Sequence, residues 1–238
     1  MTIRVAHLKT ARNFTEDAVL ADIKLYFFPR ACSGVALAGL VQSGMPFNTQ
    51  LINIFKREQY APEYMKNVHR GGKVPALVVD GVPVTENASI QMLLNEMAPD
   101  AGLMPKTDDL LEKARQRSDL IWCSSTLHPF ARMVRLPMRF SEKDAKGVYE
   151  FGTKVLLQNM VEIETRIKDG GWWYGEHWSL VDVYVNWCLI TAASNGLPLD
   201  DFPGIKDHMR RVQEIPAVME ARKIEHQAIE EHGIEYPA

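Results

Sequence analysis

The pattern of the chain changes near residue 99, and this change constrains the fold more than any other feature. From residue 23 to 98, short strand-like runs alternate with short helical patterns in the order β-α-β-α-β-β-α. Beyond the change, apolar residues recur at helical spacing along much longer segments. This order predicts a small α/β layer structure followed by an all-helical bundle domain.

A short break separates the two patterns. Pro99, Gly102 and Pro105 interrupt the periodicity, which is typical of a linker between domains. The residues before the first strand mix acidic and basic side chains without an apolar stretch, so we do not interpret them as a signal peptide. The predicted segments are an N-terminal extension at 1–22, an α/β domain at 23–98, a linker at 99–106 and an all-helical domain at 107–238.

Local signals predict where several elements begin and end. Gly44 closes the first predicted helix, and Asp80-Gly81 is a pair typical of a tight hairpin turn. Ser179 and Asp182 have the spacing of a capping box at the start of a predicted helix. We expect both hairpin strands and this helix at those positions.

Composition excludes several classes of function. A net charge of −3 argues against a nucleic-acid partner. No apolar run approaches the roughly 20 residues that span a bilayer, so no membrane association is expected. The 3 cysteines, Cys32, Cys123 and Cys188, form no CxxC pair and no zinc-ligand spacing. We therefore expect a cytoplasmic protein with free thiols and no metal.

The segment Pro29-Arg30-Ala31-Cys32-Ser33 holds the most reactive candidate. It follows a predicted strand and opens a helix, where unpaired backbone N–H groups and the helix dipole favour a thiolate. Alternatively, Cys32 is a small buried residue and Ser33 caps the helix. Taken alone, the segment leaves both interpretations open.

Two further segments are candidate ligand contacts. Val74-Pro75 directly precedes a strand, where a cis peptide would expose backbone for pairing with an extended ligand. Glu86 and Asn87 lie where a strand gives way to a helix, so that helix N-terminus could bind an anionic group and Glu86 an ammonium. Each also has a purely structural interpretation, as a strand-initial proline and as a capped helix.

Taken together, these segments resemble the cytosolic glutathione transferase superfamily from about residue 23 to 225. "EQYAPEYMKNVHRGGKVPALVVDG" and "TENASI" are similar to that family's cis-proline region and third helix, and "GGWWYGEHWSLVDVYV" to a segment of its helical domain. "PRACS" is most similar to the bacterial beta class, although Ala36-Leu37 replaces the Pro-His pair usual there. The resemblance implies a thioredoxin-like domain and a helical domain, with glutathione as co-substrate.

The resemblance also implies the roles of individual residues. Cys32 and Ser33 would be the catalytic candidates beside the glutathione sulfur, and Glu86 would hold the γ-glutamyl ammonium. His128 matches a histidine of the beta class, with Pro129 replacing the lysine that follows it there. The implied glutathione contacts are Gln59, Lys73, Val74, Pro75, Glu86 and Asn87. The implied electrophile pocket is formed by Phe28, His128, Arg132 and Arg135.

Three functions remain open from the sequence. The first is a detoxifying homodimeric enzyme that conjugates the glutathione thiolate to a small hydrophobic electrophile. The second is thiol–disulfide exchange or reductive thiolysis, in which Cys32 itself attacks sulfur. The third is a non-enzymatic interaction module with the same fold.

Overall fold

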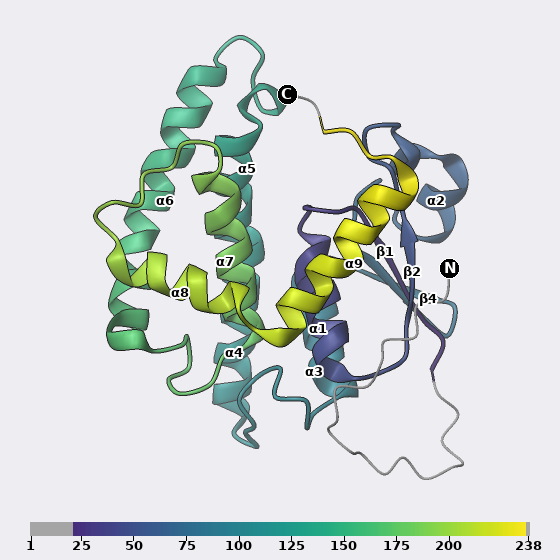
Figure 1. Cartoon of the computed structure of the whole chain (residues 1–238), viewed down its shortest axis with the longest axis horizontal. Coiled ribbons are helices and arrows are strands. Elements are labelled where there is room, and N and C mark those ends of the chain that lie inside the picture. The colour runs from purple at the N-terminus through teal and green to yellow at the C-terminus, as the bar shows by residue number, and fades with distance from the viewer. Residues whose placement is uncertain (1–20, 237–238) are drawn as a thin grey trace. The chain divides into compact units, whose positions relative to one another are not determined.

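The structure, a computed structural model, describes residues 21–236 and divides the chain into two compact units. The predicted extension at 1–22 therefore lies outside the described residues, apart from its last two. The first unit contains the sheet and its helices, and the second contains most of the long helices (Figure 1).

The first unit has the predicted element order. Its elements are β1 (Ile23–Phe27), α1 (Ser33–Ser43), β2 (Asn48–Leu51), the 3₁₀ turn η1 (Glu58–Tyr60), α2 (Pro62–Asn67), β3 (Ala76–Val79), β4 (Val82–Thr85) and α3 (Asn87–Met97). The strands form one sheet in the order β2-β1-β3-β4, in which β1 pairs parallel with β2 and antiparallel with β3. This mixed sheet and its helices confirm the predicted α/β layer structure.

Alternation along β1 separates the two faces of the sheet. Leu25 and Phe27 are buried on the face that α1 and α3 cover, as expected for a strand of period two. Tyr26 points to the opposite face, where its ring meets the edge of Tyr64 from α2. The core of the unit therefore lies between the sheet and α1 and α3.

The local turn signals are confirmed. Gly44 ends α1 in the left-handed conformation with φ of 69°. Asp80 and Gly81 join β3 to β4, with φ of 49° and 81°. Asp22 braces this turn, because its N–H donates to the Asp80 carboxylate and its carbonyl accepts from the Asp80 N–H.

The second unit is helical, as predicted. Its elements are α4 (Leu110–Trp122), the π-helical turn η2 (Cys123–Leu127), α5 (His128–Arg135), η3 (Pro137–Arg139), α6 (Ala145–Ile167), η4 (Lys168–Gly170), α7 (Leu180–Ala193) and α8 (Pro203–Gln213), with α9 (Pro216–His232) beginning at its end. α5 and α6 approach closely at Gly152, where a Cβ would lie 2.8 Å from that of Met133. This close approach requires a glycine at that position.

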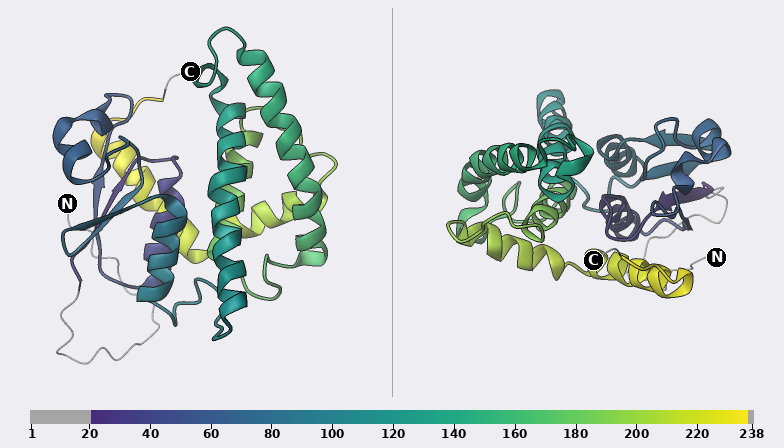
Figure 2. Two further views of the ribbon diagram at one scale, coloured as in Figure 1. Left: turned by 180° about the vertical axis from the view of Figure 1, so that it is seen from behind. Right: turned by 90° about the horizontal axis from the view of Figure 1, so that it is seen from above.

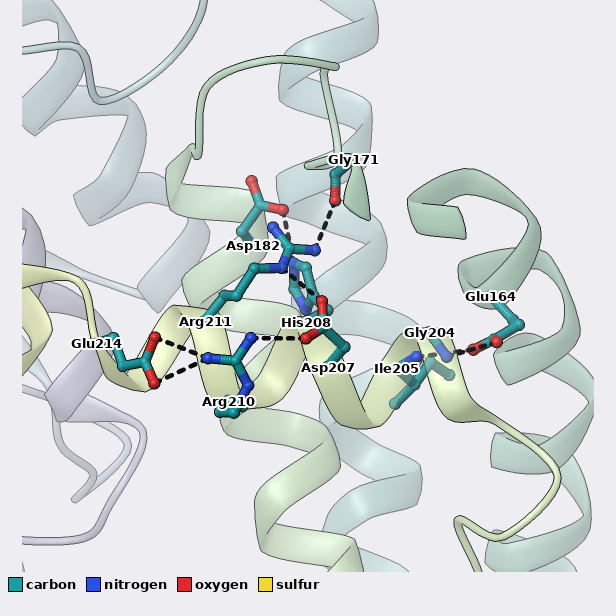
Figure 3. Close-up of polar contacts among 10 residues, drawn as sticks. All are labelled: Glu164, Gly171, Asp182, Gly204, Ile205, Asp207, His208, Arg210, Arg211 and Glu214. Atoms are coloured by element: carbon teal, nitrogen blue, oxygen red, sulfur yellow. Dashed lines mark hydrogen bonds and ion pairs between the residues drawn. The ribbon is translucent and has the colours of Figure 1, made fainter. Parts of the chain in front are cut away.

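A buried carboxylate organises the core of the second unit. Asp182 accepts hydrogen bonds from the backbone and hydroxyl of Ser179, which confirms the predicted capping box at the start of α7. It also accepts from the Trp173 N–H, and its Oδ1 lies 2.8 Å from Nε2 of His208 in α8 (Figure 3). Asp182 and His208 are both fully buried. One side chain thus joins α7 to α8 and to the loop before α7.

α8 is held at both of its ends. Glu164 of α6 accepts from the backbone N–H groups of Gly204 and Ile205 at the start of α8 (Figure 3). Nearer the other end, Arg211 donates to Asp207 and to the carbonyl oxygen of Gly171. These hydrogen bonds hold α8 against α6 and the loop at Gly171, although much of the surface of α8 is polar.

The end of the chain departs from the prediction. We expected residues 107–238 to form one helical domain, but residues from Met219 onwards group with the first unit. The physical reason is the buried face of α9, formed by Ala221, Ile224 and Ala228, together with contacts that Glu225 makes near the start of α1. α9 lies next to α1 and crosses it obliquely (Figures 1 and 2).

Candidate functional site

The loop between β1 and α1 places Cys32 at the mouth of a helix. Arg30 has a positive φ of 61°, and the Ala31 N–H donates to the carbonyl of Phe28, so the chain turns sharply before α1. Cys32 is the N-cap residue, and α1 begins at Ser33. The positive end of the α1 dipole therefore lies next to Cys32, although the Gly34 and Val35 N–H groups already donate to the carbonyls of Ala31 and Cys32.

The thiol of Cys32 meets the segment before the cis-proline. Its Sγ donates to the carbonyl oxygen of Val74 at 3.5 Å, and the side chain is half-buried. The Val74–Pro75 peptide is cis, as predicted. The structure thus brings together two sequence segments that are more than 40 residues apart.

Ser33 points away from this region. Its side chain is 0% exposed, its Oγ donates to the Phe28 carbonyl at 2.9 Å, and it accepts from the Phe28 N–H at 3.2 Å. Because the hydroxyl has one proton, this arrangement leaves none for a bound sulfur. The expectation that Ser33 donates to a ligand therefore does not agree with the geometry, which gives that hydroxyl a role inside the loop.

Asn87 connects α3 to the same loop. Its Nδ2 donates to the carbonyl oxygen of Cys32 at 2.8 Å, and its Oδ1 accepts from Nε2 of Gln91 one turn later. Asn87 and Gln91 are both buried. Sequence reasoning did not identify Gln91, although its i,i+4 spacing from Asn87 was a usable signal. Both terminal atoms of the Asn87 amide are thus already engaged, and the backbone of the α3 N-terminus is the better anion-binding group.

Glu86 stands at the entrance to α3. Its side chain is exposed and its φ is 68°, an uncommon value for a residue other than glycine. Its carboxylate interacts electrostatically with the imidazole of His69, a buried residue that the sequence analysis did not identify. Burial lowers the pKa of the His69 imidazole, and the charge of Glu86 opposes that shift.

The remaining predicted glutathione contacts lie around the loop before Pro75. Tyr64, also not identified from sequence, donates its hydroxyl to the Lys73 carbonyl at 2.7 Å and thereby holds the residue before Val74. The Lys73 side chain itself is exposed. Gln59 is buried, and within residues 21–236 its Oε1 has no hydrogen-bond partner. Gly72 lies against this region, because a Cβ there would be 3.0 Å from the Gln59 carbonyl.

Phe28 does not line an open surface. Its side chain is 2% exposed, and its ring lies 5.0 Å from the ring of Phe55 and 6.1 Å from that of Tyr236. The expectation that Phe28 forms part of an electrophile pocket is therefore not supported by its position. It belongs to an aromatic cluster that supports the loop after β1.

The other three residues predicted to contact an electrophile belong to the second unit. His128 begins α5 directly after the π-helical turn, with its Nδ1 2.9 Å from the Tyr184 hydroxyl and its ring against Trp187 at 4.6 Å. Arg132 and Arg135 follow at helical spacing and are half-buried. The three side chains thus share one side of α5.

The other two cysteines are structural. Cys123 and Cys188 are 0% exposed, as expected for core thiols, and burial raises the pKa of the Cys123 thiol. None of the three cysteines forms a disulfide. Within residues 21–236, no cluster of His, Cys, Asp and Glu side chains is arranged to hold a metal ion, and no helix is long and apolar enough to cross a membrane.

A family model and curated relatives match this chain. Residues 21–94 match the family described as "Glutathione S-transferase, N-terminal domain". Maleylacetoacetate isomerase of Pseudomonas aeruginosa is 28% identical over 212 residues, which cover 87% of this chain and 96% of that protein. Glutathione S-transferase GstA of Escherichia coli O157:H7 is 25% identical over 85% of this chain and 98% of its own length.

Solved structures agree with these relatives. The beta-class glutathione S-transferase of Sphingomonas chungbukensis superposes with a TM-score of 0.73 at 26% identity, covering 85% of this chain and 98% of that one. A sphingomonad glutathione S-transferase, solved with glutathione, gives a TM-score of 0.74 at 24% identity over 85% and 98% of the two chains. The fold therefore extends through both units.

Proposed function

We propose, from the premise that this chain belongs to the glutathione S-transferase superfamily, that it is an enzyme that conjugates glutathione to a small hydrophobic electrophile. Glutathione would bind to the first unit and supply the attacking sulfur. The observation that carries this proposal is the position of Cys32, whose thiol lies at the N-terminus of α1 and against the Val74 carbonyl. The positive end of the α1 dipole and a thiol donor meet there, where a thiolate would be stabilised.

The residues around Cys32 support the binding of an extended tripeptide. The backbone of Val74, beside cis-Pro75, would pair with the cysteinyl part. The exposed Glu86 carboxylate would hold the γ-glutamyl ammonium, and the start of α3 would hold the adjacent carboxylate. Gln59 and Lys73 are proposed contacts for the glycyl end.

The proposed reaction needs no group beyond the two substrates. The glutathione thiol loses its proton to solvent, and the thiolate attacks an electrophilic carbon to form a carbon–sulfur bond. With an aryl halide, the halide leaves with its electron pair; with an activated alkene, the adjacent carbon takes up a proton. The P. aeruginosa relative, named an isomerase, makes an activated alkene a useful first electrophile to test.

A second function is favoured by the side-chain geometry around Cys32. The Cys32 thiol is only half-buried, whereas the Ser33 hydroxyl is enclosed. Cys32 could therefore attack the sulfur of a disulfide, forming a mixed disulfide and releasing the other sulfur as a thiolate. Because Cys123 and Cys188 are buried in the second unit, a glutathione molecule would have to resolve that intermediate.

Two variants of Cys32 separate these reactions. Conjugation predicts that Cys32→Ser, which keeps a donor, retains activity with an activated aryl halide within about threefold, and that Cys32→Ala loses more. Disulfide chemistry predicts that both variants lose all exchange with a small disulfide. Loss of aryl halide conjugation in Cys32→Ser would reject the conjugation proposal in this form.

A binding test separates both reactions from a non-enzymatic module. We expect the protein to be retained on immobilised glutathione and released by free glutathione. Failure to bind would favour an interaction module with this fold. The proposed working form is a homodimer in the cytoplasm, which is compatible with three cysteines that form no disulfide.

A further inference from the structure

The C-terminal segment from Met219 to Tyr236 contacts the Cys32 loop from outside the sheet domain's own sequence. This segment groups with the first unit, although almost 120 residues of the second unit separate the two in sequence. Its helical part, α9, lies beside α1 (Figure 2). Two of its side chains reach the backbone between Phe28 and Cys32.

Glu225 is the first of these side chains. Its Oε1 accepts a hydrogen bond from the backbone N–H of Arg30 at 3.2 Å. The same oxygen lies 3.1 Å from the point where a Cβ on Gly34 would be, so the glycine leaves room for the carboxylate beside the first turn of α1. Burial raises the pKa of Glu225 to about 7.

Tyr236 is the second. Its hydroxyl donates to the carbonyl oxygen of Pro29 at 2.9 Å, and its ring lies 4.3 Å from Cζ of the Arg30 guanidinium. The ring also packs edge-on against Phe55 at 5.5 Å. The two contacts made by Glu225 and Tyr236 thus involve the backbone of consecutive residues, Pro29 and Arg30.

We propose that Glu225 and Tyr236 are positioning residues for the thiol site, because they fix the backbone of Pro29 and Arg30 immediately before Cys32. Arg30 adopts a positive φ there, and a loop with that conformation needs contacts that hold it. Two side chains of the C-terminal segment supply such contacts. They bind backbone atoms of the loop, so the contacts do not depend on the loop's own side chains. The expected effect on glutathione binding rests on the proposed function. The effect on the Cys32 thiol can be measured without glutathione.

The test compares variants of the two contacts in the full chain. Glu225→Ala and Tyr236→Ala remove each contact, Tyr236→Phe removes only the hydroxyl, and Glu225→Gln keeps an acceptor for the Arg30 N–H. Glu231→Ala is the matched control, because Glu231 is an exposed acid on the same helix whose carboxylate accepts a hydrogen bond from Gln227. Thermal unfolding identifies the variants that remain folded.

The first readout is the rate at which iodoacetamide alkylates Cys32, followed across pH and assigned by peptide mass. We expect Glu225→Ala and Tyr236→Ala to raise the pH of half-maximal alkylation and to change the rate by about threefold or more, the scale of one lost hydrogen bond. Loosening the first turn of α1 would move the positive end of its dipole away from the sulfur. Tyr236→Phe should shift the profile in the same direction by less, and Glu225→Gln less than Glu225→Ala.

The second readout is the KM for glutathione against kcat. Misplacement of the loop should raise KM roughly two- to tenfold in the alanine variants, with Glu231→Ala unchanged. If wild type binds no glutathione, the proposed function fails, whereas the alkylation profiles still decide the positioning role. Profiles that coincide with wild type in every folded variant would overturn the inference, even if the melting temperatures fall.

Discussion

The side-chain amide of Asn87 donates to the carbonyl oxygen of Cys32 at 2.8 Å, so the N-terminus of α3 holds the N-terminus of α1. Gln91 donates in turn to Asn87, which makes the contact a buried chain of two hydrogen bonds. Two helix N-termini are thereby fixed beside one thiol. This arrangement suits a ligand that carries both a sulfur and a carboxylate.

Asn87→Ala should weaken both the fold and the site. Removing the amide leaves the Gln91 amide without its buried acceptor and takes one donor from the Cys32 carbonyl, which also accepts from the Val35 N–H; this costs about 1 to 3 kcal/mol of unfolding free energy. Urea denaturation measures that cost, with Ser89→Ala as the control because Ser89 is exposed on the same helix. Equal stability of the two variants would show that the Asn87 contacts contribute nothing.

Glu86→Ala should weaken glutathione binding. If the exposed Glu86 carboxylate meets the γ-glutamyl ammonium, its loss removes a charged hydrogen bond and raises the Kd roughly ten- to a hundredfold. Isothermal titration calorimetry gives the Kd, and Glu142→Ala in the second unit controls for the change in net charge. A Kd equal to that of the control would exclude Glu86 from the site.

Ser33→Ala should act on stability rather than selectively on chemistry. The buried Phe28 N–H would lose its acceptor and the Phe28 carbonyl would lose one of its two donors, keeping the Ala31 N–H, at a cost of about 1 to 3 kcal/mol in unfolding free energy. Ser125→Ala, an exposed serine in the second unit, serves as the control. Should Ser33→Ala keep its stability and lose conjugation, the hydroxyl must reorient in the complex and donate to the glutathione sulfur.

Several parts of the fold could be predicted because their signals are local. The Asp80-Gly81 turn and the Ser179–Asp182 capping box depend on residues within a few positions of each other, and both are confirmed. The order of strands and helices follows from apolar spacing in the same way. The candidate segments around Cys32 and Val74 could also be found, and the structure places them in contact.

The remaining features depend on contacts between distant residues. The turn of the loop decides whether the Ser33 hydroxyl points to a ligand or to Phe28. The sequence of residues 29–33 is compatible with both arrangements. Tyr64 acts on Lys73 through tertiary structure, and its position in a short helix gives no sign of it. The grouping of α9 with the first unit likewise depends on which surface buries its apolar face. An amphipathic pattern predicts that a helix has such a face, but not the element against which it packs.

Glu225 should make stability depend on pH. Its pKa of about 7 in the folded chain exceeds the ordinary value of 4.5, so the folded state binds the proton more tightly than the unfolded state. Stability should be greatest below about pH 4.5 with respect to this group, and it should fall by roughly 1 to 3 kcal/mol as pH rises to about 7. Arg30 and Arg222 carry the charges that oppose the shift.

Glu225→Gln tests this dependence, since it removes the titration and should flatten the fall between pH 4.5 and 7. Denaturation at several pH values gives the slope, and Glu231→Gln should retain the wild-type curve. The same slope in Glu225→Gln as in wild type would assign the pH dependence to other groups.

The protein should sediment as a homodimer. Large apolar side chains are exposed on α4 and α6, including Leu110 at 80%, Leu111 at 71% and Val161 at 61%, and an interface would cover such residues. Sedimentation velocity at micromolar concentration should give twice the chain mass of 27.0 kDa. A single species at the chain mass would contradict a stable dimer.

A crystal structure of the protein with glutathione tests the central claim most directly. The account predicts the glutathione sulfur within about 4 Å of the Cys32 Sγ, at the N-terminus of α1, with the cysteinyl backbone paired to Val74. The γ-glutamyl group should lie at Glu86 and the start of α3. Glutathione bound elsewhere, or with its sulfur turned away from Cys32, would contradict the account.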